Sequence, residues 1–157
     1  MKRITPFLWF NDQAEQATEF YLSIFDHSRI LNIVRHGEEG PNPVGSVMYT
    51  QFILDGQEFM ALNGGPYFNF TPAISLFVNC ETQSEVDKYW EKLSEGGEKG
   101  QCGWLKDKFG LSWQIVPMGI NDYLYGKDIE GSKRAMEAML KMHQLDLEAL
   151  KKAYFQK

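Results

Sequence analysis

The chain repeats itself once, and this internal repeat constrains its fold more than any other feature. The stretch that begins at Phe7 (FLWFN) matches the stretch that begins at Ser75 (SLFVN), and Tyr21 corresponds to Tyr89 at the same offset. A sequence that repeats at a fixed offset indicates a repeated structural module. The sequence therefore predicts two copies of one small module.

Each copy shows the same order of elements. An apolar stretch typical of a strand precedes a helix start signal, which pairs Asp12 with Glu15 in the first copy and Thr82 with Glu85 in the second, spaced as in a capping box. Apolar residues then recur every three or four positions, so one face of each helix packs on a sheet. Further strands follow, near 29–35, 46–54 and 57–63 in the first copy and near 97–100, 101–106 and 111–117 in the second. The order βαβββ is thus predicted twice.

The tail from Ile120 onward departs from the repeat. Ser132 can cap one helix, and Leu145-Asp146 has the form of a hydrophobic staple followed by a cap for a second helix that ends near Tyr154. One continuous helix is the alternative. Its apolar stripe must be covered, either by the tail's own domain or by a partner subunit; the stripe consists of Leu147, Leu150 and Tyr154.

These patterns define the predicted architecture. We expect an α+β fold with a first module over residues 1–68, a second over 69–119 and a helical tail over 120–157. A chain of 157 residues buries roughly 70% of its unfolded surface, so it needs neither disulfides nor metal to fold.

Composition excludes several classes of function. Sixteen Lys and Arg against twenty-one Asp and Glu give a net charge of -5, which argues against binding to nucleic-acid phosphates. No apolar run approaches the length of a membrane span, and Asn11-Asp12 interrupts the first apolar stretch before it could form a signal peptide. Cys80 and Cys102 fit no metal-binding spacing and are expected to be reduced thiols. We therefore expect a cytoplasmic protein that binds neither nucleic acid nor membrane.

Three stretches carry a resemblance to a known superfamily. They are CGWLKDKFGLSWQIVP from Cys102 to Pro117, TPFLWFN from Thr5 to Asn11, and FMALNGG from Phe59 to Gly65. Together with the duplicated module and the Met-rich tail, they resemble the vicinal oxygen chelate superfamily of glyoxalase I, extradiol dioxygenases and fosfomycin- and bleomycin-resistance proteins. Within it, the chain resembles the PhnB-like branch, which is often labelled demethylubiquinone methyltransferase-like. The sequence lacks the glycine-rich loop between strand and helix that a Rossmann-type nucleotide site requires.

The resemblance implies two cupped mixed sheets that face a cavity, with the helices on their convex sides. Because side chains alternate along a strand, this arrangement sends every second residue into a cup. Trp113 is then expected to face the helix layer. The side chains expected to line the cavity and to contact a ligand are Thr5, Phe7, Trp9, Asn63, Ser75, Phe77, Cys102, Trp104, Lys106, Ser112 and Gln114.

The resemblance also suggests where a metal would bind. Metal-binding members of the superfamily carry their ligands at positions that correspond here to Thr5 (or Pro6), Ala61, Ala73 and Gln114. None of these is His, Asp or Glu, and a neutral amide is a poor replacement for a carboxylate. The three histidines lie outside the expected cup. We therefore predict that the protein carries neither a metal nor another cofactor.

Three functions remain open. The aromatic cup favours a small-molecule binding protein whose ligand has an apolar body and one or two hydrogen-bonding or anionic groups. Lys106 either holds such an anion or extends along the rim. The first alternative is an enzyme of unknown reaction in the same cavity, and the second is a structural dimer or protein-interaction module. The expected partners are the small-molecule ligand and, because the tail stripe needs a surface, a second copy of the chain in a homodimer.

Overall fold

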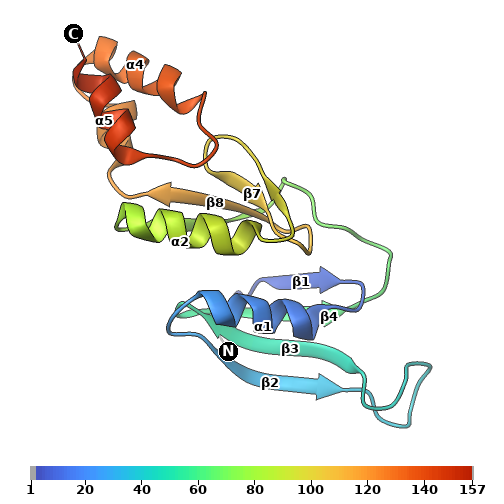
Figure 1. The fold of residues 1–157 in the computed structure, drawn as a ribbon. Helices are drawn as coiled ribbons and strands as arrows, with labels where there is room; N and C mark the ends of the chain where they lie inside the picture. The colour runs from blue at the N-terminus through green and yellow to red at the C-terminus, as the bar shows by residue number, and fades with distance from the viewer. Residues whose placement is uncertain (1–2, 157) are drawn as a thin grey trace. The chain divides into compact units, whose positions relative to one another are not determined.

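The computed structural model describes residues 3–156. The chain divides into two compact units between Phe70 and Thr71 (Figure 1). Each unit contains one four-stranded mixed sheet and a helix inserted after its first strand. None of the helices in the described residues has the length and apolar character needed to cross a membrane.

The two sheets share one topology. In the first unit the strand order is β1-β4-β3-β2, and in the second it is β5-β8-β7-β6. The outer pairs β1/β4 and β5/β8 are parallel, and the other neighbours are antiparallel. This equivalence confirms the duplicated βαβββ module and the α+β class.

The first unit comprises β1 (Phe7–Phe10), α1 (Ala14–Ile24), β2 (Arg29–Arg35), β3 (Val47–Leu54) and β4 (Gln57–Asn63). The second comprises β5 (Ser75–Cys80), α2 (Gln83–Ser94), β6 (Glu98–Lys99), β7 (Trp104–Lys106), β8 (Ser112–Pro117) and the tail helices.

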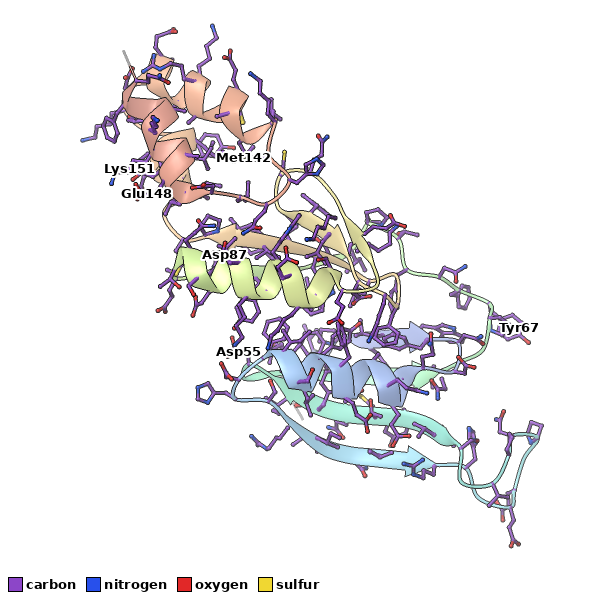
Figure 2. The ribbon with its side chains drawn as sticks, viewed as in Figure 1. Asp55, Tyr67, Asp87, Met142, Glu148 and Lys151 are labelled. Atoms are coloured by element: carbon purple, nitrogen blue, oxygen red, sulfur yellow. The ribbon has the colours of Figure 1, made fainter. Side chains whose placement is uncertain are left out.

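The core of the first unit lies between α1 and one face of its sheet. Tyr21 of α1 and Phe52 of β3 are almost completely buried. A buried hydrogen bond of 2.7 Å joins the hydroxyls of Thr18 and Thr50, so the polar groups at this interface satisfy each other. The tight turn between β3 and β4 carries Asp55, labelled in Figure 2, in a left-handed conformation.

The two inserted helices begin differently. Thr82 caps α2 as predicted, because its Oγ1 accepts a hydrogen bond of 3.2 Å from the N–H of Glu85. The corresponding prediction for α1 is wrong: Asp12 does not occupy the N-cap position, and Gln13, which does, makes no side-chain cap bond. Instead, Asn63 at the end of β4 accepts a hydrogen bond of 2.8 Å from the N–H of Ala14. A residue at the end of a strand thus caps α1 in place of Asp12, the local residue that the sequence suggested.

A buried carboxylate organises the second sheet. Asp107 is 2% exposed, and its Oδ1 accepts hydrogen bonds from the N–H groups of Phe109 and Leu111 at 2.9 and 3.0 Å. Its Oδ2 accepts a hydrogen bond of 2.9 Å from Nε1 of Trp113. The turn between β7 and β8 is therefore tied to the central tryptophan of β8. Trp113 is buried on the α2 side of the sheet, as expected.

The tail forms part of the second unit. It contains α3 (Ile120–Leu124), which the sequence did not suggest, followed by α4 (Ile129–Met139) and α5 (Leu147–Phe155). Asp146 caps α5 as predicted, with an Oδ1 to Ala149 N distance of 2.9 Å. Ser132 does not begin a helix but lies within α4, whose N-cap position is Asp128. The continuous-helix alternative is also wrong, because α4 and α5 are separate.

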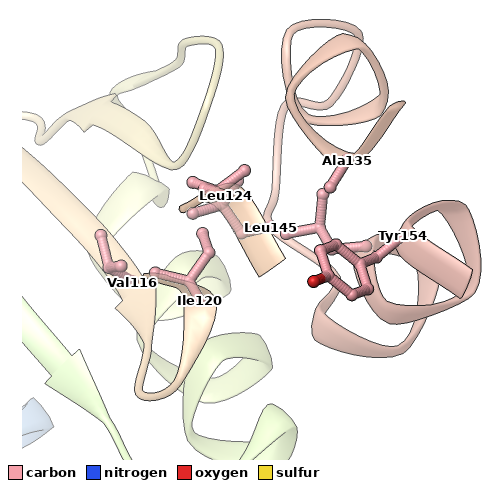
Figure 3. Packing of buried hydrophobic residues seen from close by; sticks show 7 residues of the cluster. Val116, Ile120, Leu124, Ala135, Leu145 and Tyr154 are labelled. Carbon is pink, nitrogen blue, oxygen red and sulfur yellow. The ribbon is translucent and has the colours of Figure 1, made fainter. Parts of the chain in front are cut away.

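The tail helices share one apolar cluster with the end of β8 (Figure 3). Tyr154 of α5 is 8% exposed and Leu150 is completely buried, so their stripe is covered within the unit. The argument that this stripe requires a partner subunit therefore no longer holds. The buried members of the cluster are Val116, Ile120, Leu124, Ala135, Leu145, Leu150 and Tyr154.

The Asp107 network generates a stability prediction. In Asp107→Asn, an amide oxygen can still serve the two backbone N–H groups, but the amide NH₂ then faces the indole N–H of Trp113. Two buried donors facing each other should lower the free energy of unfolding by about 1 to 3 kcal/mol in a urea titration. Exposed Asp122→Asn is the matched control and should change it by less than about 0.5 kcal/mol. Equal stability of the two variants would contradict this role for Asp107.

Candidate functional site

Strand register places a set of predicted site residues on one face of the second sheet, the face that points away from α2. Phe77 pairs with Gln114 across the parallel β5/β8 ladder, and Trp104 pairs with Gln114 across β7/β8. Directly paired residues point to the same side of a sheet. Their neighbours Leu76 and Trp113 therefore point to α2. We call the sheet face that carries Phe77, Trp104 and Gln114 the open face.

The open face and the tail enclose a cleft of about 540 Å³ in the second unit, here called the tail cleft. One wall of the cleft is the sheet, and the opposite wall comes from the segment that leads through α3 to α4. The lining residues are Phe77, Asn79, Cys102, Trp104, Gln114, Val116, Pro117, Met118, Gly119, Ile120, Asn121, Leu124, Tyr125, Met139 and Leu145.

Four of the predicted site residues line this cleft: Phe77, Cys102, Trp104 and Gln114. Ser75 supports one of them, because its Oγ accepts a hydrogen bond of 2.9 Å from Nε2 of Gln114. The structure thus brings together the central part of the predicted set.

Two other predicted residues of the second unit do not reach the cleft lining. Ser112 shares the open face with Ser75 but is 3% exposed. Lys106 continues the open face beyond Trp104, and its Nζ lies 3.3 Å from a carboxylate oxygen of Glu98 at the sheet edge. Of the two positions foreseen for this lysine, the structure favours the rim.

In the first unit, Phe7 and Trp9 lie on the sheet face away from α1, as alternation predicts. Phe7 is 52% exposed, and Trp9 donates a hydrogen bond of 3.0 Å from Nε1 to the carbonyl of Gly65. Thr5 precedes β1 and is half-buried. None of these three residues lines the cleft of the second unit, and a ligand role for them in the first unit stays a separate prediction.

The orientation predicted for Asn63 is wrong. Asn63 pairs with Phe10, and Ala61 with Leu8, across the parallel β1/β4 ladder, so both point to the α1 side where Leu8 and Phe10 are buried. The side chain of Asn63 is used there: besides capping α1, its Nδ2 donates a hydrogen bond of 3.1 Å to the carbonyl of Val47. The error arose because the strand's faces were assigned one residue out of step.

A second hollow of about 610 Å³ lies in the first unit, beside the start of α1. Two of the charged residues that line this hollow, Arg35 and Glu15, form an ion pair of 2.5 Å, and Arg35 also donates a hydrogen bond of 3.2 Å to the carbonyl of Gly45. Asn63, which also lines it, is engaged as described above. Arg35, Glu15 and Asn63 are thus engaged within the protein, whereas the tail cleft gathers four of the predicted site residues, so we take the tail cleft as the stronger candidate for a ligand site.

Sequence reasoning missed the contribution of the tail to the site. Asn79 could have been found, because it lies two residues after Phe77 on the same strand face. Asn121 and Tyr125 of the α3 region, and Met139 of α4, carried no signal, because the fold of the tail did not follow from the repeat.

The residues present do not fit the metal site that the superfamily implies. Ala61 has no donor atom and faces α1, and the side-chain amide of Gln114 already holds Ser75. Within residues 3–156, no three His, Cys, Asp or Glu side chains gather as a metal-binding group. The absence of a bound metal from the protein stays a prediction.

Comparison with known proteins identifies the family. Residues 2–116 match the family model of 3-demethylubiquinone-9 3-methyltransferase. A PhnB protein of Bacillus cereus, described as a candidate member of that methyltransferase group, is 42% identical to this chain. The match covers 74% of this chain and 99% of that one, with a TM-score of 0.69. The chain therefore belongs to the PhnB-like family.

More distant structures share the fold. A protein of Pseudomonas aeruginosa is 20% identical over 74% of this chain and 98% of its own, with a TM-score of 0.62. The fosfomycin-resistance protein FosX of Listeria monocytogenes, solved with Mn(II) and sulfate, is 15% identical over 80% of this chain and 97% of its own, with a TM-score of 0.52. A search of curated proteins found no match. The match to the family model covers residues 2–116 and does not include the tail.

The two cysteines should differ in reactivity. Cys80 is completely buried, and burial together with the nearby carboxylate of Glu85 raises the pKa of its thiol to about 11. At pH 8 only about one Cys80 in a thousand is then a thiolate, the reactive form. Half-buried Cys102 lines the cleft, so a disulfide reagent should modify it first and reach Cys80 only after unfolding.

Ellman's reagent at pH 8 measures this difference. One thiol per chain should react in the folded protein, and the variant Cys102→Ser should lose that reaction. Two thiols that react at equal rates without denaturant would contradict the placement of Cys80.

Proposed function

We propose that this protein binds a small molecule in the tail cleft. The observation that carries the proposal is the convergence of Phe77, Trp104 and Gln114 on one wall of a cleft of about 540 Å³. That volume lies within the range of about 300 to 1,000 Å³ typical of small-molecule sites. Aromatic walls with a few placed polar groups are the usual composition of such sites.

The polar groups of the cleft can orient a ligand. The bond from Nε2 of Gln114 to Ser75 fixes the amide and leaves its Oε1 as an acceptor. Within residues 3–156 Nε1 of Trp104 donates to no protein acceptor, so it is available as a donor for a ligand. Asn79 adds a further amide. A planar molecule with one acceptor and one donor can therefore stack on the aromatic wall and bond at its edges.

Binding is favoured over catalysis by the chemistry of these groups. Side-chain amides and indoles recognise uncharged polar groups and are poor acids and bases near neutral pH. The methyl transfer named in the family description would require a site for a methyl donor, and the glycine pattern of a Rossmann-type nucleotide site is not in the sequence.

The homodimer also stays a proposal. Its support is the exposed aromatic surface of the first unit, where Phe7 packs edge-on against Tyr49 yet remains 52% exposed. Such a surface is suited to association. A solution mass near twice 18.1 kDa would support it, and a mass of one chain at micromolar concentration would contradict it.

A thermal-shift screen of neutral and charged aromatic fragments tests the binding proposal. A fragment present at 100 times its Kd stabilises the folded state by about 2.7 kcal/mol, which corresponds to a rise in Tm of roughly 5 to 10 °C for a chain of this size. Trp104→Ala should abolish that rise for the best fragments, because it removes both a stacking surface and a donor.

Trp9→Ala is the matched control, because it removes an indole from the first unit and leaves the tail cleft intact. It should preserve the fragment-induced rise. The proposal is overturned if no fragment shifts the Tm, or if Trp9→Ala abolishes the shift while Trp104→Ala does not.

A further inference from the structure

The tail cleft has two walls of different origin. The sheet wall belongs to the family module, which ends at residue 116. The opposite wall is built by the tail, with Asn121 and Tyr125 from the α3 region and Met139 from α4. The match to the Bacillus cereus relative covers 99% of that chain but only 74% of this one, so about a quarter of this chain has no counterpart in it.

We propose that the tail (residues 120–157) is a specificity element, which makes the cleft select uncharged, aromatic-sized ligands over anions. This inference rests on the proposed function, because it concerns the ligand of the same cleft. It adds that the tail sets the ligand class and that the class is neutral.

The tail wall is firmly attached to the sheet. Cys102 and Gly103 adopt consecutive left-handed conformations, with φ of 55° and 81°, and this turn directs their N–H groups to the tail. The N–H of Cys102 donates a hydrogen bond of 2.9 Å to the carbonyl of Met142, labelled in Figure 2, and the N–H of Gly103 donates one of 2.8 Å to that of His143. Any side chain at position 103 would approach Leu145 to 2.9 Å, so the contact requires glycine.

Further bonds hold the tail from the other side. Nε2 of Gln83, at the start of α2, donates a hydrogen bond of 2.9 Å to the carbonyl of Leu145, and its Oε1 accepts one of 3.1 Å from the N–H of Leu147. The thiol of Cys102 donates to the carbonyl of Met139 at 3.6 Å. These bonds keep the wall in place before a ligand arrives, which lowers the entropy cost of binding.

The chemistry of the cleft determines which ligand it accepts. Among the described residues, every side chain that lines it is uncharged. An anion that enters loses hydration, and no lining cation compensates for that loss. Lys106, which could have supplied one, is instead paired with Glu98. A neutral amide or phenol loses much less hydration and can bond to Gln114 and Asn121.

A matched pair of probes separates charge from shape: 2-naphthamide and 2-naphthoate have nearly the same size, but only the second is an anion at pH 7.5. Equilibrium dialysis with the full chain should show about tenfold tighter binding of the amide. Asn121→Lys places a cation on the tail wall and should bring the affinity for the carboxylate up to or above that for the amide. Gln156→Lys adds the same charge outside the cleft and should leave the ratio unchanged.

Removal of the whole tail would expose the apolar cluster on β8, so a point variant tests the wall itself. Tyr125→Ala should weaken amide binding by about tenfold. Ile129→Ala, which removes an equally exposed side chain away from the cleft, should have no effect.

The possible results separate the two proposals. If both probes bind equally well and Trp104→Ala weakens both, the cleft binds small molecules but the selection of neutral ligands is refuted. If Trp104→Ala weakens binding while Tyr125→Ala and Asn121→Lys change nothing, the role of the tail is refuted. If neither probe binds up to its solubility limit, the proposed function fails for ligands of this size, and the further inference fails with it.

Discussion

The pairing of β8 with its two neighbours is the constraint on which the candidate site depends. A strand shifted by one residue turns every side chain to the opposite face of a sheet. The observed register places Phe77 of β5 and Trp104 of β7 on either side of Gln114. The same register buries Trp113 against α2, so the aromatic residues of β8 and its neighbours divide between core and cleft.

Two sets of contacts fix this register from opposite ends of the sheet. At one end, Asp107 accepts hydrogen bonds from the following turn and from the indole of Trp113. At the other, the left-handed turn at Cys102 and Gly103 joins β7 to the tail, while the N–H of Ile115 in β8 donates a hydrogen bond of 2.8 Å to the carbonyl of Gly103. The cleft is thus a consequence of how the second unit folds, because the contacts that align its strands also position its tail wall.

The sequence predicted most of the fold, because the repeat and its alternation are local signals. The strand faces of β5, β7 and β8 followed from the alternation of side chains and the cupped sheets that the resemblance implies. For Asn63, alternation gave the wrong face of the sheet, because the sequence did not show which residues of β4 pair with β1. The observed pairing with Phe10 places Asn63 on the α1 side. The predicted cap of α1 was wrong for a related reason. Asn63, which is distant in the sequence, accepts the hydrogen bond from the N–H of Ala14, and local spacing does not reveal such a contact.

The tail was the least predictable part of the site. Its caps are short local patterns, of which Asp146 was recognised correctly and Ser132 was not. The contacts that bring Asn121 and Met139 to the cleft depend on the packing of three helices against Val116, and this packing has no equivalent in the repeat. Long-range packing of an added segment cannot be derived from the periodicity of the module to which it is added.

The most direct test of the account is a ¹H–¹⁵N NMR titration of the labelled protein with 2-naphthamide, which observes side-chain amides and indoles individually. If the tail cleft is the binding site, the indole signal of Trp104 and the side-chain amide signals of Gln114, Asn79 and Asn121 should shift together with one Kd. The signals of Trp9 and Asn63, in the first unit, should stay in place. Saturable shifts confined to Trp9, Asn63 and their neighbours would contradict the central claim and place the ligand in the first unit instead.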